Sequence, residues 1–177
     1  MNPISASLTV RPGADKEHPG GKASSGVLVS AIIPVRDRPE ELARALRSVV
    51  AQTLPSWEAI VVDDGSDVSL EDVCLRFGDQ RIRYHRLAAK RNANVARNEG
   101  LRLARGRYVA MLDSDDEWLP SHLEAKLAAL ERGGWDGVFG SYILDDGADR
   151  HDCLSRDFRP GETMPDYLLS YGGAVTP

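Results

Sequence analysis

The feature that most constrains the fold of this chain is a repeated alternation of apolar strands and amphipathic helices. Val27–Pro34 and Trp57–Val62 are almost continuously apolar, which is typical of strands covered on both faces. Helical spacing of apolar residues follows each of them, and strand and helix alternate four times along the chain. This alternation predicts right-handed crossovers and an α/β fold, with an open, mostly parallel sheet and helices on both faces.

The remaining segments extend this pattern. Arg81–Leu87 alternates apolar and basic residues, as an edge strand does, and Asn92–Arg105 is predicted to be a helix packed closely on the sheet. Tyr108–Leu112 is predicted to be the fourth strand. Val138–Leu144 is expected to form a fifth strand, with residues 151–158 as its hairpin partner, and residues 163–171 a short helix.

Composition bounds the class of protein. The 177 residues are 42% hydrophobic and 28% charged, which is ordinary for one soluble domain. Residues 1–26 are rich in Pro and Gly, so we expect a flexible N-terminal tail before a domain at 27–177. The net charge of -5 argues against nonspecific nucleic-acid binding. Neither a signal peptide nor a transmembrane segment is predicted, which suits a cytoplasmic protein.

Polar clusters follow three of the predicted strands, at residues 34–37, 63–66 and 113–116. Parallel strands end at the same rim of a sheet, and ligands bind outside those carboxyl ends. Four carboxylates, from Asp113 to Glu117, follow the strand at Tyr108–Leu112. Adjacent negative charges require a positive partner, and oxygen ligands suit Mg²⁺ or Mn²⁺ bound together with a diphosphate. An acidic turn that caps the next helix is the simpler interpretation of this segment alone.

Four segments resemble, in order and spacing, the motifs of family 2 glycosyltransferases of the GT-A (Rossmann-like) fold. They are Val29–Asp37, Val61–Ser66, Ala96–Asn98 and Leu112–Asp116, and the resemblance extends from Val27 to about Leu144. It implies transfer of a sugar, with inversion, from a nucleotide-diphosphate sugar to an acceptor hydroxyl, assisted by Mn²⁺ or Mg²⁺. It also implies a saccharide or lipid-linked acceptor and bacterial polysaccharide or glycoconjugate biosynthesis, with peripheral association at the inner face of the membrane.

The resemblance assigns roles to individual residues. Asp115 is expected to ligate the metal, and Asp113 is expected to face the ribose or a metal-bound water. Asp113 and Asp115 are therefore the predicted metal-site residues. The residues expected to bind the donor are Pro34 and Val35 against the nucleoside, Asp37 near the base, Asp64 on the base or ribose, Arg97 near the base or phosphates, and Asp113 and Ser114.

Several of these residues also have a purely structural interpretation. Asp37, with Glu40 three residues later, has the pattern of a helix cap. Asp64 suits a turn beside Gly65, and Arg97 suits a solvated helix surface. Trp118 is expected to be a core or rim anchor, with a place in the sugar pocket as the alternative.

The resemblance has two departures. Inverting transfer needs a general base, and no carboxylate of this sequence matches that motif, so the catalytic base is not identified. We therefore expect the chain to be C-terminally incomplete, either as the donor-binding part of a longer enzyme or as a non-catalytic nucleotide-sugar-binding fragment. In addition, Asn92-Ala93-Asn94 lacks the glycine common before the Ala-Arg-Asn stretch.

Other classes fit less well. A receiver domain requires its acidic pair after the first strand, whereas Asp63-Asp64 follows the second. An EF-hand loop starting at Asp113 requires Gly at its sixth position, which is Trp118 here. A nucleotidyltransferase remains an alternative, although its glycine-rich basic phosphate loop is absent from the first strand's end. The sugar, the nucleotide, the acceptor and the oligomeric state are left open by the sequence.

Overall fold

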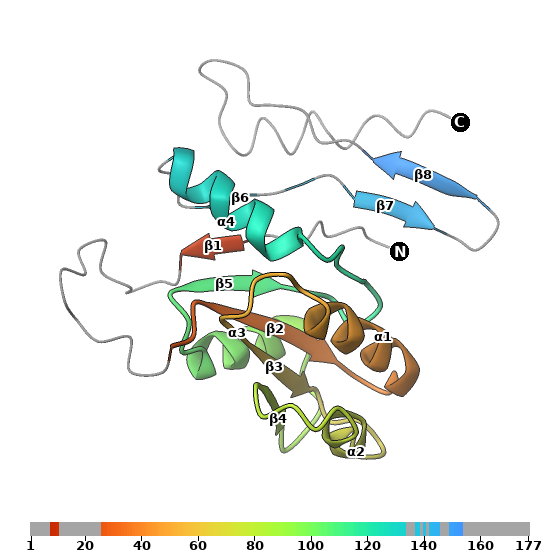
Figure 1. The fold of residues 1–177 in the computed structure, drawn as a ribbon. Coiled ribbons are helices and arrows are strands. Elements are labelled where there is room, and N and C mark those ends of the chain that lie inside the picture. The colour runs from red at the N-terminus through yellow and green to blue at the C-terminus, as the bar shows by residue number, and fades with distance from the viewer. Residues whose placement is uncertain are drawn as a thin grey trace. The chain divides into compact units, whose positions relative to one another are not determined.

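A computed structural model of the chain describes residues 8–10, 26–133, 137–138, 140, 142–145 and 149–153. It contains two compact units, Met1–Gly140 and Ser141–Pro177. The elements of the first unit are β1 (Leu8–Val10), β2 (Val29–Val35), α1 (Pro39–Val50), β3 (Trp57–Asp63), α2 (Glu71–Leu75), β4 (Ile82–Arg86), α3 (Ala93–Leu103), β5 (Tyr108–Met111), α4 (His122–Gly133) and β6 (Gly137–Val138); those of the second are β7 (Tyr142–Asp145) and β8 (Arg150–Cys153) (Figure 1).

The first unit is built on a sheet with the strand order β4-β3-β2-β5-β1-β6. β4, β3, β2 and β5 are parallel, and Val29 at the start of β2 lies opposite Trp57 of β3 and Tyr108 of β5. β1 is antiparallel to β5 and β6. The prediction of an open, mostly parallel α/β sheet is therefore confirmed. The strands β3 and β4 lie on one side of β2, and β5 lies on the other side. The topological switch point of the sheet is therefore between β2 and β5.

Helices cover both faces of the sheet, as Figure 1 shows for α1 and α3. Ile33 and Val61 belong to a core shared with α1, α2 and α4, whereas Ile32 and Ile60 belong to a second core shared with α3. All seven residues of β2 and of β3 are buried, which explains their continuous apolar sequence. α3 lies very close to the sheet, because a Cβ on Gly100 would be 2.4 Å from Cγ2 of Ile32.

Part of the predicted N-terminal tail is a strand. Leu8–Val10 forms β1 and pairs with β5, so the expectation of a flexible segment is wrong for these three residues. A short apolar and β-branched segment suits the edge that β5 would otherwise expose. Residues 1–7 and 11–25 lie outside the described residues, and for them the tail stays a prediction.

The region predicted as a fifth strand contains two strands. β6 ends at Val138 and β7 begins at Tyr142, with Gly140 between them, and glycine weakens a continuous strand. In the second unit β7 and β8 form an antiparallel hairpin, which confirms the predicted pairing over His151–Cys153; residues 154–158 of the predicted partner lie outside the described residues. The helix predicted at 163–171 lies outside the described residues. No helix in the described part of the chain is long and apolar enough to cross a bilayer.

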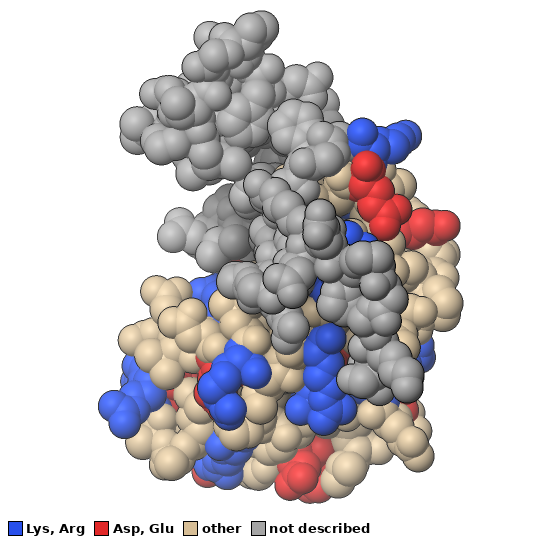
Figure 2. Space-filling view, turned by 90° about the vertical axis from the view of Figure 1, so that its left-hand side faces the viewer, with Lys and Arg blue, Asp and Glu red and all other residues tan. Residues whose placement is uncertain are grey.

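A buried carboxylate organises the amino ends of the parallel strands. Glu58 of β3 is 3% exposed, and its Oε1 accepts hydrogen bonds from Ser30 Oγ (2.7 Å) and the Arg105 backbone N–H (2.7 Å). Its Oε2 accepts from the Arg83 guanidinium at 2.8 Å. Burial alone would raise the pKa of Glu58, but these hydrogen bonds hold that pKa below its usual value. Figure 2 shows this end of the sheet, where Lys and Arg side chains are scattered among uncharged residues.

Candidate functional site

The candidate site lies at the opposite, carboxyl end of the sheet, where the arrowheads of β2, β3 and β5 point to the same side in Figure 1. Asp37, just after β2, has a φ of 51°, a conformation that Asp tolerates better than most residues. Its N–H donates to Ser66 Oγ (3.0 Å), and its Oδ1 accepts from the Asp67 N–H (2.7 Å). The loop after β2 is therefore tied to the loop after β3.

The same geometry corrects the predicted role of Asp37 as a helix cap. The residue that precedes α1 is Arg38, and it makes no side-chain capping hydrogen bond. Pro39 follows it in the first turn of the helix, where proline is well tolerated because an N–H there would have no partner within the helix. The carboxylate of Asp37 instead orders the neighbouring loop, so Asp37 stays at the rim without capping α1.

Asp63 is the structural anchor of the loop after β3. Its side chain is fully buried; Oδ1 accepts from the Ser66 N–H (2.8 Å), and Oδ2 accepts from the Tyr84 hydroxyl (2.5 Å). Burial, together with this hydrogen bond to Asp63, raises the pKa of Tyr84. Sequence reasoning gave Asp63 no separate role, because only the pairing of β3 with β4 brings Tyr84 to it.

Asp64 lies at the rim and stabilises the turn after β3 through its backbone and its side chain. Its backbone N–H donates to the Val35 carbonyl (2.9 Å), and its Oδ1 accepts from the Arg91 N–H (2.8 Å). Gly65 follows with a φ of 69°, and a Cβ there would lie 2.6 Å from the Lys90 backbone nitrogen. The segment before α3 thus rests directly on this turn. No donor among the described residues reaches Oδ2 of Asp64, and the predicted contact of this buried side chain with a base or ribose stays a prediction.

Two arginines from different elements hold the carboxylates after β5. Arg97 of α3 donates to Oδ1 of Asp113 at 2.6 Å, and both side chains are 21% exposed. Arg97 is therefore not a solvated helix charge. Arg38, after β2, donates to Oδ2 of Asp115, after β5, at 2.5 Å. This contact crosses the topological switch point between β2 and β5. In open α/β sheets ligands bind at this switch point.

Asp116 carries the excess negative charge of the cluster. Burial and the neighbouring carboxylates of Asp115 and Asp113 raise the pKa of Asp116 to about 6. Its backbone N–H donates to the Asp113 carbonyl at 3.0 Å, which closes a turn around Ser114. Ser114 is buried, at 5% exposure, so its predicted contact with the donor stays a prediction.

The carboxylates after β5 are of the chemical type that binds Mg²⁺ or Mn²⁺, and the metal site expected there stays a prediction. Within the described ranges no group of three His, Cys, Asp or Glu side chains is arranged to hold a metal. Asp113 and Asp115 supply carboxylates only, and Mg²⁺ is commonly held by one or two carboxylates with phosphates and water completing its shell. Burial first, and then the charges of Asp115 and Asp113, raise the pKa of Asp116, so like charges meet in this loop.

The apolar residues predicted near the donor are part of the core. Pro34 and Val35 are buried in β2, and Val35 packs in the core shared with α1. Their contact with a nucleoside stays a prediction. Trp118 is 6% exposed and belongs to the same core, where its ring stacks on His122 with centroids 4.9 Å apart. The core-anchor interpretation of Trp118 therefore fits better than a place in a sugar pocket.

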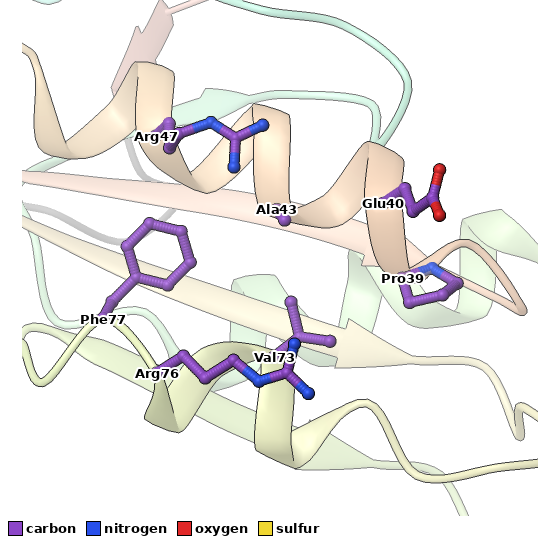
Figure 3. A pocket seen from close by; sticks show the side chains of 7 residues that line it. All are labelled: Pro39, Glu40, Ala43, Arg47, Val73, Arg76 and Phe77. Carbon is purple, nitrogen blue, oxygen red and sulfur yellow. The ribbon is translucent and has the colours of Figure 1, made fainter.

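A separate hollow of about 460 Å³ lies between α1 and α2 (Figure 3). Apolar side chains of Val73 and Phe77 face arginines there, and the other lining residues are Pro39, Glu40, Ala43, Arg47 and Arg76. None of the residues predicted to bind donor or metal lines it. The site at the rim is thus distinct from this groove.

Sequence reasoning missed Arg38 as a site residue. The signal was present, because Arg38 directly follows the polar cluster at 34–37. Its partner Asp115 lies 77 positions later, and only the adjacency of β2 and β5 brings the two side chains together.

Comparisons with known proteins agree with this geometry. Residues 30–172 match the family model described as glycosyl transferase family 2. A relative from Escherichia coli, "UDP-Glc:alpha-D-GlcNAc-diphosphoundecaprenol beta-1,3-glucosyltransferase WfgD", is 34% identical over 117 residues. That match covers 66% of this chain and 46% of the relative, so the chain spans about half the relative's length.

Solved structures share the fold. Residues 1–349 of TarS from S. aureus, in complex with UDP, superpose with a TM-score of 0.57 at 24% identity, over 67% of this chain and 34% of that one. The mannosyltransferase PcManGT from Pyrobaculum calidifontis, in complex with GDP-Man and Mn²⁺, gives a TM-score of 0.53 at 22% identity, over 62% of this chain and 34% of that one. Since the family model matches most of its length, the chain belongs to glycosyl transferase family 2.

Proposed function

We propose that this chain binds a nucleotide-diphosphate sugar at the rim formed by the loops after β2, β3 and β5, as part of an enzyme that transfers the sugar to an acceptor hydroxyl. The observation that carries the proposal is the arrangement of Asp64 on the loop after β3 and of Asp113 and Asp115 on the loop after β5, with Arg38 from the loop after β2 and Arg97 from α3 beside the last two carboxylates. This arrangement offers both an acidic site for a cation and guanidinium groups for a diphosphate.

The chemistry follows from the charge that develops on the leaving group. When the bond to the sugar breaks, the departing nucleoside diphosphate gains negative charge. A bound Mg²⁺ or Mn²⁺ supplies Lewis-acid stabilisation of that charge. Asp115 and Asp113 would hold the cation, and Asp113 would also face the ribose or a water on the metal. Arg97 adds a fixed positive charge, and the free oxygen of Asp64 accepts a hydrogen bond from the base or ribose.

The donor and acceptor are proposed by analogy with the relatives. WfgD is named for UDP-Glc and for an acceptor linked to diphosphoundecaprenol, and TarS is described with UDP. We therefore propose a UDP-sugar donor and a saccharide acceptor carried on a lipid diphosphate, in bacterial polysaccharide assembly. Such an acceptor places the reaction at the inner face of the cytoplasmic membrane.

A thermal-shift panel tests the donor site. UDP, GDP, dTDP and CMP are added with and without Mn²⁺, and a nucleotide that binds the folded state raises the melting temperature. We expect stabilisation by UDP that depends on Mn²⁺ and little effect of CMP, which lacks the second phosphate. The absence of any metal-dependent shift with all four nucleotides contradicts the proposal.

The alternative is a domain that binds the donor without transfer. It is favoured by one observation, the lack of a carboxylate that matches the general-base motif in the sequence. A transfer assay with UDP-[¹⁴C]glucose and a lipid-diphosphate GlcNAc acceptor separates the two. Product formation by this chain identifies an enzyme, whereas tight UDP binding without product identifies the binding domain.

A further inference from the structure

The ion pair between Arg38 and Asp115 occupies the carboxylate that the proposed function gives to the metal. Arg38 donates to Oδ2 of Asp115 at 2.5 Å, and the two side chains are 49% and 44% exposed. Exposed pairs of this kind contribute little to stability, because water screens them and both side chains lose rotamer freedom. The pair can therefore open without disturbing the fold.

The backbone around Arg38 is fixed although its side chain is exposed. Asp37, immediately before it, is held by Ser66 Oγ and by the Asp67 N–H. α1 begins immediately after it, at Pro39. A guanidinium on such an anchored residue can move only within the neighbourhood of the switch point. Arg38 is thus restricted to the region where the proposed diphosphate would lie.

A guanidinium and a divalent cation cannot share one carboxylate oxygen. Mg²⁺ requires oxygen ligands at about 2.0–2.1 Å, and a second positive charge at hydrogen-bond distance from the same oxygen opposes it. A free cation must therefore displace Arg38, or bind the other oxygen of Asp115 beside the positive charge of Arg38, and either arrangement weakens its binding. A cation that arrives with a diphosphate brings an anionic partner for Arg38, since phosphate oxygens accept bidentate hydrogen bonds from arginine.

We propose that Arg38 is a positioning residue that holds Asp115 when the site is empty and moves to the diphosphate when the metal–nucleotide complex binds. The inference rests on the proposed function, and it assigns Arg38 a role that neither the family match nor the relatives' names provide. Its consequence is coupling: the cation and the nucleoside diphosphate bind more tightly together than either does alone.

Manganese titrations followed by electron paramagnetic resonance test this coupling without a transfer assay. The Kd of Mn²⁺ is measured with and without UDP for the wild-type chain, Arg38→Gln, Arg38→Lys and Arg44→Gln. Arg44 is the matched control, because it lies on α1, pairs with Glu117 at 3.3 Å and is 47% exposed, close to the 49% of Arg38. Circular dichroism and melting temperature confirm that each variant is folded.

We expect Arg38→Gln to tighten binding of Mn²⁺ alone by about five- to tenfold, and to reduce the enhancement by UDP by at least as much. Arg38→Lys keeps the charge but loses the bidentate fork, so it falls between wild type and Arg38→Gln. Arg44→Gln changes both quantities by less than about twofold, because Arg44 pairs with Glu117 and not with a proposed metal ligand, and water screens its exposed charge.

Two results overturn the inference in distinguishable ways. If Arg38→Gln binds Mn²⁺ alone as wild type does while UDP and Mn²⁺ still bind together, Arg38 has no such role and the donor site stands. If the wild-type chain shows no joint binding of UDP and Mn²⁺, the proposed function fails and the inference fails with it.

Discussion

Carboxylates at opposite ends of the same sheet pair with arginine, but one pair is mostly buried and the other is exposed. At the amino end Glu58 is 3% exposed and accepts hydrogen bonds from three donors, one of which is the charged guanidinium of Arg83. At the carboxyl end Asp115 has one arginine, and both partners are about half exposed. The first group is saturated and belongs to the fold. The second is incompletely satisfied, and such groups mark sites where a ligand completes the set.

The pKa directions show the same contrast. Hydrogen bonds hold the pKa of Glu58 below its usual value despite burial, whereas burial and like charge raise the pKa of Asp116 to about 6. The comparison therefore separates a saturated ionic network from an exposed one, which is the network to which we assign the proposed cation. Four substitutions can break or sharpen this distinction.

Asp115→Ala should have the largest effect. It removes the proposed metal ligand, so we expect the affinity for UDP in the presence of Mn²⁺ to fall at least a thousandfold, about 4 kcal/mol. The melting temperature of the ligand-free chain should change little, because the lost ion pair is exposed. Calorimetric titration measures the affinity, and Glu117→Gln is the control. Equal UDP affinity in Asp115→Ala and wild type contradicts this assignment.

Glu58→Gln should lower the stability of the chain and leave its affinity for UDP unchanged, the opposite of Asp115→Ala. It breaks a buried ion pair and leaves the Arg83 charge without its partner, so we expect a loss of about 3 kcal/mol in the free energy of unfolding. The UDP affinity of the folded fraction should stay unchanged, because Glu58 lies at the other end of the sheet. Urea denaturation measures the loss. Glu99→Gln, which removes surface pairs with Arg102 and His85, should leave the free energy of unfolding almost unchanged.

Asp64→Asn should give a smaller, ligand-specific effect. Asparagine keeps an Oδ1 that can accept from the Arg91 N–H, so the loop and the stability of the chain are retained. It loses the second carboxylate oxygen, and we expect UDP to bind about tenfold more weakly, about 1.4 kcal/mol. Comparison of UDP with pyrophosphate is informative, since a defect confined to UDP locates Asp64 at the nucleoside. A large fall in melting temperature would instead assign Asp64 to the fold alone.

Asp116→Asn should have the smallest effect, and it should increase the free energy of unfolding where Glu58→Gln lowers it. A raised pKa means that the folded state holds the proton more tightly, so the stability from protonation is complete below about pH 4 and is lost as pH rises through about 6. We expect the variant to gain about 1 kcal/mol at pH 7 without metal, because solvent screening reduces the full effect of the shift. At pH 4 the difference should vanish. Melting temperatures from pH 4 to 8 measure it, and equal profiles would contradict the account of Asp116.

Much of the fold could be predicted because it depends on local patterns. β2 and β3 are continuously apolar since both of their faces are covered, and this alone indicates a central parallel strand. β1 could not be predicted, because three residues carry little signal and their place depends on the edge of β5. The capping role of Asp37 was wrong for a similar reason, since the acceptor role of its carboxylate depends on a loop 30 residues away.

The site was predicted as a set of loops but not as a network of contacts. Asp64, Arg97, Asp113 and Asp115 follow from motif order, and the sheet topology places their loops at one rim. The pairing of Arg97 with Asp113 and of Arg38 with Asp115 could not be predicted, because each joins residues from separate elements. The anchoring of Asp63 by Tyr84 is hidden for the same reason.

The most direct test of the central claim is the position of the cation on the folded chain. At 19.3 kDa the chain suits backbone amide NMR spectra, and Mn²⁺ broadens the signals of nearby amides. With UDP present and substoichiometric Mn²⁺, we predict loss of the amide signals of Asp37, Gly65 and residues 113–116, while those of Arg105 and Gly106 beside Glu58 persist. Broadening at Arg105 and Gly106, or none at 113–116, would contradict the account.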